Sequence, residues 1–134
     1  MAVGAPRPAT PRTAEQERAH FALQRVRQAR DQVGDKRKEF RSLAQSAPSD
    51  IQVNGLAHVL AFWKAKNERH HQALFQAVSD WVKKDLGLPG GEDLLTWITN
   101  PSTSSVQYRH ATASALAVLV WIKRFAEVEI PDEG

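Results

Sequence analysis

The stretch SDIQVNGLAHVLAFWKAK, residues 49–66, carries two conflicting local signals. Asn54-Gly55 is a dipeptide typical of tight turns. The residues on both sides nevertheless repeat at helical spacing, and the alternating β-rich flanks that a hairpin needs are absent. We therefore predict one helix from Ser49 to about Lys66. Its glycine costs about 1 kcal/mol relative to alanine, and we expect the close approach of another backbone to offset this cost.

On a helical wheel this predicted helix has two apolar faces. The first face consists of Val53, Leu56, Leu60 and Trp63. The second face consists of Ile51, Gly55, His58 and Phe62. A helix with two apolar faces is either central in the fold or shared between the core and a partner. The sequence leaves open whether the close neighbour of Gly55 belongs to this chain or to a partner.

The rest of the chain is also predicted to be helical, because no segment alternates with the period of a strand. Three capping boxes predict helix starts, at Thr13–Gln16, Ser49–Gln52 and Ser104–Gln107. Asp35 is the predicted N-cap of a second helix. The predicted stops are Gly34, Pro48 and Gly87. We expect an all-α fold, a single compact bundle of about six helices over residues 13–134, preceded by a disordered tail over residues 1–12.

The last predicted helix, from Ser104 to about Glu127, is apolar on more than one side. Its main core face consists of Ala111, Ala115, Val118, Leu119, Ile122 and Phe125. The other side carries Ala113, Leu116, Ala117 and Val120. Arg109 and Lys123 lie in line with Leu116, seven residues away on either side. Both a buried central helix and a protein–protein surface with a charged rim fit this pattern.

The net charge of +3 is unevenly distributed along the 134 residues. Residues 1–41 contain ten Lys and Arg against five Asp and Glu, and residues 42–134 contain eight against ten. Such a basic segment indicates either an anionic partner, such as nucleic acid, or a solvated helix face. The densest cluster is Lys36, Arg37, Lys38 and Arg41. Cations at a helix N-terminus oppose the macrodipole, which favours a bound phosphate there.

Several classes of protein are disfavoured. The chain has no cysteine, no apolar run of the roughly 18 residues that a membrane span needs, and no hydrophobic signal region; we expect it in the cytoplasm and not in a membrane. There is no phosphate-binding loop and no HExxH motif. His70 and His71 are adjacent on a helix and should point about 100° apart, which suits a shared metal poorly. We predict no enzymatic activity, no cofactor and no metal site.

Two long motifs resemble a known family. They are FRSLAQSAPSDIQVNGLAHVLAFWKAK, residues 40–66, and YRHATASALAVLVWIKRFAE, residues 108–127. Together they resemble the small subunit of type III-B CRISPR effector complexes, the fifth Cmr protein, over about residues 15–127. The resemblance implies an all-helical, non-catalytic subunit that acts in antiviral defence. Copies of it would stack along the guide RNA against the guide–target RNA duplex, with the backbone and large Cmr subunits as protein partners.

Contact residues follow from the resemblance by position. The candidates are Arg41, Asn54, Gly55, Lys64, Lys66, Arg109, Lys123 and Arg124, and Lys38 is added for its charge. The packing or partner candidates are Ile51, Asn54, Gly55, His58, Phe62, Leu116 and Val120. Ser114 departs from the family, whose members often carry a carboxylate there. The alternative function is a helical protein–protein adaptor with no direct nucleic-acid role.

Overall fold

The computed structural model describes residues 12–132, and every regular element in that range is helical. The elements are α1 (Ala14–Val33), the short 3-10 helix η2 (Gly34–Lys36), α2 (Arg37–Asn54), α3 (Leu56–Lys66), α4 (Arg69–Leu86), α5 (Leu94–Ile98) and α6 (Ser105–Glu129). The predicted all-α fold of about six helices is therefore confirmed. The predicted tail lies outside the described residues, except for Arg12.

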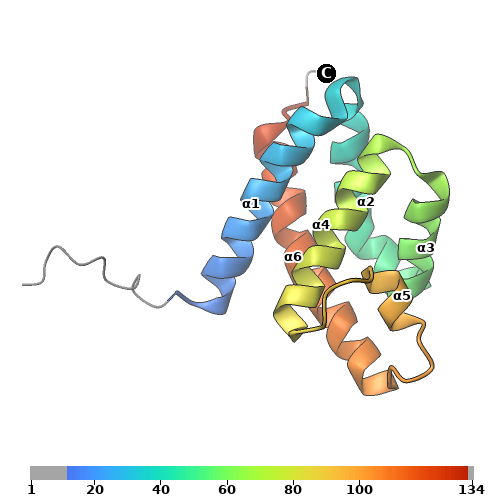
Figure 1. Ribbon diagram of the computed structural model, residues 1–134. Helices are drawn as coiled ribbons and strands as arrows, with labels where there is room; N and C mark the ends of the chain where they lie inside the picture. Colours follow the sequence, from blue (N-terminus) through green and yellow to red (C-terminus); the bar gives the residue numbers. More distant parts are fainter. Residues whose placement is uncertain (1–11, 133–134) are drawn as a thin grey trace, which may run out of the picture.

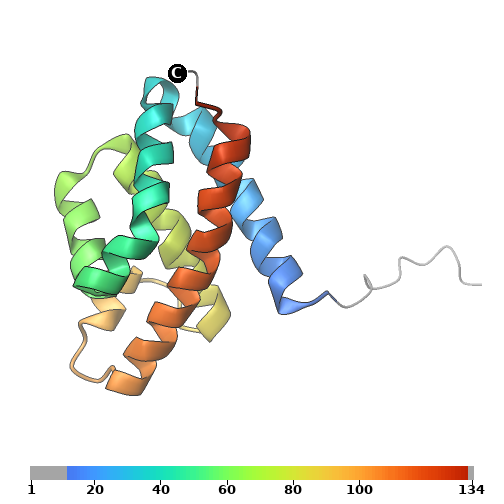
Figure 2. The ribbon, with the colours of Figure 1, turned by 180° about the vertical axis from the view of Figure 1, so that it is seen from behind.

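The longest helix, α6, is the centre of the bundle. It packs against α1, α2 and α4, with α4 on one side of the bundle (Figure 1) and α2 beside α6 on the other (Figure 2). α1 and α6 run in the same direction, whereas α2 runs antiparallel to α6 (Figures 1 and 2). Within residues 12–132 no helix is long and apolar enough to cross a membrane.

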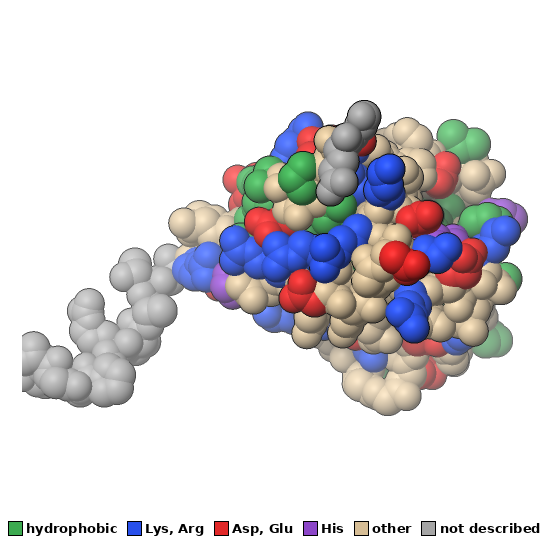
Figure 3. Space-filling model, turned by 90° about the horizontal axis from the view of Figure 1, so that it is seen from above, with side chains coloured by type: hydrophobic (Ala, Val, Ile, Leu, Met, Phe, Trp, Pro, Cys, Tyr) green, Lys and Arg blue, Asp and Glu red, His purple; other side chains and the backbone are tan. Residues whose placement is uncertain are grey.

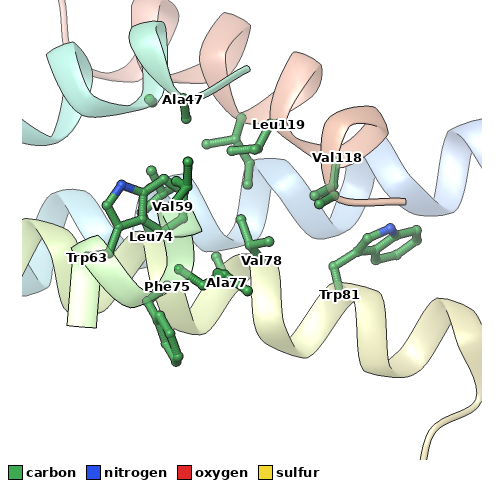
Figure 4. Packing of buried hydrophobic residues seen from close by; sticks show 14 of the residues in the cluster. Ala47, Val59, Trp63, Leu74, Phe75, Ala77, Val78, Trp81, Val118 and Leu119 are labelled. Atoms are coloured by element: carbon green, nitrogen blue, oxygen red, sulfur yellow. The ribbon is translucent and has the colours of Figure 1, made fainter. Parts of the chain in front are cut away.

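Outside residues 49–66, the core is formed largely by the helix faces that the apolar spacing predicts; Phe125, predicted on the core face of the last helix, is half-buried. On α6 the buried residues Ala111, Ala115, Val118, Leu119 and Ile122 are three or four positions apart, so they share one side of the helix. Figure 4 shows Trp81 of α4 beside Val118, and Trp63 of α3 near Leu74. Burying a large apolar side chain contributes about 1.5–3 kcal/mol, so these contacts dominate the packing of the helices.

Two predicted capping boxes are confirmed. The Thr13 hydroxyl accepts a hydrogen bond from the N–H of Gln16 at 3.0 Å, and the Gln16 side chain accepts one from the N–H of Thr13 at 2.9 Å. Ser104 and Gln107 form the same pair at the start of α6. Gly87 ends α4 in the left-handed conformation, with φ 65°, as a C-terminal glycine commonly does. These boundaries depend only on local chemistry.

The predicted boundary between the second and third helices is wrong. α2 continues through Pro48 and ends at Asn54, so Ser49 lies inside a helix and does not cap one. Asp35 lies within η2 and is not the N-cap of α2. A proline inside a helix costs about 3 kcal/mol. One continuous buried stripe on α2, which includes the fully buried Phe40 and Ile51, outweighs this cost because each large side chain contributes about 1.5–3 kcal/mol.

The helix breaks at Gly55, where it was predicted to continue. Gly55 has φ 89° and ψ 152°, a conformation that side-chain-bearing residues rarely adopt. It ends α2 and begins α3. Ile51 is consequently 2% exposed while Val53 is 81% exposed, although a continuous helix to residue 66 would group Val53 with the core residues of α3. Each of the two apolar faces that the sequence predicted for one helix is thus divided by the break, with its first residue on α2 and the others at Gly55 or on α3.

Candidate nucleic-acid and partner interface

The C-terminal half of α6 meets α2 through a polar cluster. Arg124 and Glu127 form an ion pair, with Nη1 and Oε1 2.8 Å apart. The hydrogen bond from Arg124 is the main cause of a lowered pKa of Glu127, and it outweighs the opposing effect of burial. The charge of Arg124 and the side chains of Gln45 and Arg41 on α2 lower this pKa further. The packing of α2 on α6 therefore lets Arg41 and Arg124 act on the same carboxylate.

Helical spacing places three more candidates along this contact. Arg109, Leu116 and Lys123 are seven residues apart and Glu127 follows Lys123 by four, so all four share one flank of α6. Because Glu127 interacts with α2, this flank faces α2. Leu116 and Lys123 are accordingly half-buried, and Arg109 is exposed.

The same argument applies to α2, where Lys38, Arg41 and Gln45 are three and four positions apart. We call the surface where α2 and α6 meet the α2–α6 seam; Figure 2 shows the two helices side by side. Five of the seven predicted RNA-contacting cations border it. They are Lys38, Arg41, Arg109, Lys123 and Arg124.

Arg41 is partly enclosed in this seam. Its side chain is half-buried, and its Nε atom is fully enclosed without a hydrogen-bond partner among residues 12–132. An enclosed donor without a partner costs about 1–3 kcal/mol. The attraction of the guanidinium to Glu127 opposes this cost.

The other two predicted cations lie away from the seam, on α3. The Nζ atom of Lys64 is 2.5 Å from Oδ2 of Asp93, the N-cap of α5. Burial alone would raise the pKa of Asp93, but hydrogen bonds from Lys64 and Thr96 together with the charge of Lys64 lower it. Lys64 therefore fixes α5 to α3. Lys66 lies over the ring of Phe62, 5.6 Å from its centroid, in a cation–π contact.

The predicted partner residues do not form one surface. Ile51 is buried in the core and is not available to a partner. Asn54, His58 and Phe62 line a shallow pocket of about 270 Å³ between the end of α2 and α3. Phe62 is 49% exposed there. Leu116 is half-buried near the α2–α6 seam, and Val120 is 57% exposed on the same helix.

The close neighbour of Gly55 belongs to this chain. A Cβ atom added to Gly55 would lie 3.4 Å from the hydroxyl oxygen of Tyr108, on α6. That hydroxyl accepts a hydrogen bond from the backbone N–H of Ala57 at 3.0 Å. The predicted close approach of another backbone is therefore wrong: the neighbour is a side chain of the last helix, and the backbone conformation of Gly55, with φ 89°, is what favours glycine there.

Much of the basic excess in residues 1–41 is neutralised inside the molecule. Arg25 pairs with Asp80 at 2.5 Å. Arg27 and Arg30 both pair with Glu129, at 3.4 and 2.8 Å. When the molecule is viewed from above, Lys and Arg side chains form a row with Asp and Glu side chains beside it (Figure 3). The arginines of α1 thus hold α1 against α4 and α6.

Comparison with known proteins identifies the family. A family model described as CRISPR-associated protein (Cas_Cmr5) matches residues 14–129. The chain belongs to the Cmr5 family. It is 30% identical over 122 residues to the CRISPR system Cmr subunit Cmr5 of Thermus thermophilus, covering 90% of this chain and 99% of that protein. The resemblance seen in the two motifs is confirmed.

The fold agrees with that of a solved family member. The X-ray crystal structure of a CRISPR-associated Cmr5 family protein from Thermus thermophilus matches this chain with a TM-score of 0.70. The two chains are 30% identical, and the match covers 90% of this chain and 99% of the other. The helical arrangement that forms the α2–α6 seam is therefore that of a Cmr5-family protein.

Several residues of this Cmr5-family chain were not predicted from the sequence. Tyr108 opens the second motif, but its role at α3 depends on how α6 packs. Gln45 and Glu127 join the seam only through tertiary contact. Ser114, where the resemblance leads us to expect a carboxylate, donates a hydrogen bond to Oδ2 of Asp85 at 2.6 Å. A carboxylate is thus present at this place, but it comes from α4.

Proposed function

We propose that this Cmr5-family protein is a non-catalytic structural subunit of a type III-B Cmr complex, an RNA-guided complex of antiviral defence. We further propose that its α2–α6 seam lies against the phosphate backbone of the guide–target RNA duplex. Family membership supports the assembly. Arg41 and Arg124 come from two helices that pack together and both act on the Glu127 carboxylate, and this is the observation that supports the RNA contact.

Such a seam suits binding without sequence readout. Cations that contact phosphates position a protein on a duplex but carry no sequence information, and base pairing supplies specificity in RNA-guided complexes. Lys38, exposed at one end of the seam, and Arg109, exposed near the other, are far enough apart on their helices to follow a backbone. The enclosed Nε of Arg41 is compatible with this role, because a phosphate would reach the outer nitrogens of the guanidinium.

Exposed apolar side chains favour protein partners next to the seam. Val120 precedes Arg124 by one helical turn and is 57% exposed. Val53 and Phe62 are also exposed, near the corner between α2 and α3. Exposed apolar side chains beside charged residues are typical of a protein interface with a polar rim. We infer that neighbouring copies of this chain and the backbone and large Cmr subunits contact these residues.

A helical adaptor without an RNA role is the second candidate function. It is favoured by the ion pairs of Arg27 and Arg30 with Glu129, because they neutralise cations that RNA would otherwise use. Co-purification from the native host tests the assembly itself. Recovery with other Cmr subunits and guide RNA is the expected result, and recovery as a lone protein would contradict membership of the complex.

Salt dependence in the reconstituted complex tests the RNA contact. Lys38→Glu should weaken target-RNA binding and reduce the slope of log affinity against log salt by roughly 0.9 for each duplex phosphate that the protein no longer neutralises. Lys84→Glu is the matched control, because Lys84 is an exposed cation on α4, away from the seam. An unchanged slope for Lys38→Glu, in a complex that still assembles, would favour the adaptor.

A further inference from the structure

Two buried histidines lie in contact at the start of α4. His70 and His71 are 7% and 6% exposed. Their ring centroids are 4.2 Å apart, with 39° between the planes. The sequence predicted that the two side chains diverge, because neighbouring positions on a helix differ by about 100°. The rings nevertheless meet, since His71 is packed by Phe62 of α3 with ring centroids 6.3 Å apart.

Neither histidine is satisfied by the residues around it. The Nδ1 atoms of both rings are enclosed and have no hydrogen-bond partner within residues 12–132. An enclosed, unpaired polar atom costs about 1–3 kcal/mol. Native proteins rarely leave such atoms unpaired, and a bound water or ion is a common explanation. Two such atoms on adjacent, touching rings therefore point to a ligand.

A carboxylate completes the cluster. Glu68 is the residue before α4, and one of its oxygens and one ring nitrogen of each histidine all lie within 4.8 Å of one another. Two imidazole nitrogens and a carboxylate oxygen are the donors that zinc and similar divalent transition metals prefer. We propose that Glu68, His70 and His71 bind a zinc ion at the N-terminus of α4.

The geometry needs only a small adjustment. Zinc binds nitrogen and oxygen ligands at about 2.0–2.2 Å, which places tetrahedral ligand atoms roughly 3.3–3.6 Å apart. The three ligand atoms lie within 4.8 Å of one another, so rotation of the exposed Glu68 side chain together with a shift of the histidine rings would bring them to this distance. Three protein ligands leave the fourth zinc position for water or for a group from a partner.

The surrounding charges decide how tightly such an ion is held. Burial is the main cause of a lowered pKa of His71; the charges of His70 and Lys66 act in the same direction and Glu68 opposes them. A neutral imidazole is the form that binds a metal. Lys66 and the positive end of α4 repel a cation, and the Glu68 carboxylate offsets that repulsion.

An ion has a route to this cluster from solvent. His70 lines an open groove of about 440 Å³ together with Lys38, Glu39, Ser42, Leu43 and Ser46 of α2. Glu39 places a second carboxylate in this groove. A bound zinc would tie the turn between α3 and α4 to the first turn of α4, and should therefore stabilise the folded chain.

Metal titration of the purified full-length protein tests the site. After chelator treatment, we expect calorimetry to show saturable binding of one Zn²⁺ per chain and the melting temperature to rise with Zn²⁺. Co²⁺, used as a spectroscopic probe, should give the visible absorption of a four-coordinate site. Loss of even an outer-shell partner costs about 10–100-fold in metal affinity, so Glu68→Gln, which alters a ligand, should weaken Zn²⁺ binding at least about tenfold, and His71→Gln should remove the Co²⁺ signal.

His20→Gln is the control, because His20 is an exposed histidine on α1 and its loss should leave binding unchanged. The proposal is overturned if the wild-type protein shows no saturable binding of one equivalent. It is equally overturned if Glu68→Gln binds Zn²⁺ as tightly as wild type. Glu68→Gln alters an exposed side chain, so it remains informative even if His71→Gln does not fold. None of these readouts depends on RNA or on the Cmr complex.

Discussion

The hydroxyl of Tyr108 accepts a hydrogen bond from the backbone N–H of Ala57 at 3.0 Å. Ala57 is the second residue of α3, and the first N–H groups of a helix have no partner within it. Gly55, which precedes α3, has no side chain with which to cap it. Tyr108 therefore replaces the missing cap from α6, and it ties the last helix to the corner between α2 and α3.

Tyr108→Phe should lower the free energy of unfolding by about 1 kcal/mol, because it leaves the Ala57 N–H without its protein acceptor. Urea denaturation measures the effect. Ser46→Ala is the control: its exposed hydroxyl donates to the carbonyl of Leu43 at 3.3 Å, so its loss should change the free energy by less than about 0.5 kcal/mol. Equal stabilities for wild type and Tyr108→Phe would show that the hydroxyl does not cap α3.

Gly55→Ala should destabilise the protein by about 2 kcal/mol, since a Cβ is strained in this backbone conformation. The backbone at Gly55 has φ 89°, and the new methyl would meet the Tyr108 hydroxyl at 3.4 Å. Gly90→Ala is a matched control, because a Cβ there meets nothing within 4 Å. Thermal and urea unfolding of both variants compare the two sites, and equal stabilities would refute the assigned break at Gly55.

Ser49→Ala tests whether Ser49 caps a helix or lies inside α2, because the two alternatives predict changes of opposite sign in the free energy of unfolding. If Ser49 capped a helix, the change would destabilise the protein by about 1 kcal/mol. Ser49 instead lies exposed inside α2, where alanine has the better helix propensity, so we expect a gain of a few tenths of a kcal/mol. Ser104→Ala removes a true cap and should cost about 1 kcal/mol. A loss at Ser49 as large as that at Ser104 would contradict the continuous α2.

Acid should weaken the attachment of α5. The folded-state pKa of Asp93 lies below its ordinary value of 3.8, so its contribution to stability is complete above about pH 4 and is lost as the pH falls through the folded pKa. Asp93→Asn, which keeps an N-cap side chain, should flatten this part of the pH dependence. Urea denaturation from about pH 6 down to about pH 3 provides the measurement, and an unchanged acid slope in Asp93→Asn would argue against the interaction with Lys64.

The fold class and most helix boundaries could be predicted because they depend on neighbouring residues. The Thr13 and Ser104 caps and the Gly87 stop are contacts within one turn, and the confirmed core stripes follow from spacing alone. The Pro48 boundary failed because a local cost of about 3 kcal/mol competes with burial of Phe40 and Ile51 on either side of it. Local sequence patterns cannot weigh these two terms, because the burial depends on contacts with other helices.

The candidate site was predictable in part. The motifs selected cations that border one seam, but no spacing rule separates Arg124, near α2, from Lys64, which is paired with Asp93. The histidine cluster was missed because helical spacing describes where side chains start. The final positions of the two rings depend on burial and on packing against Phe62, which helical spacing does not describe.

Residue identity at short and regular spacing was enough to establish the all-α fold, the caps at Thr13 and Ser104, and the family. The end of α2 depends instead on contacts between helices. Asn54-Gly55 carries both a turn signal and a helical pattern, so local residues do not decide between them. Tyr108 lies about 50 residues later in the chain. Its hydrogen bond to Ala57 stabilises the broken form, because it satisfies a donor that only the break exposes.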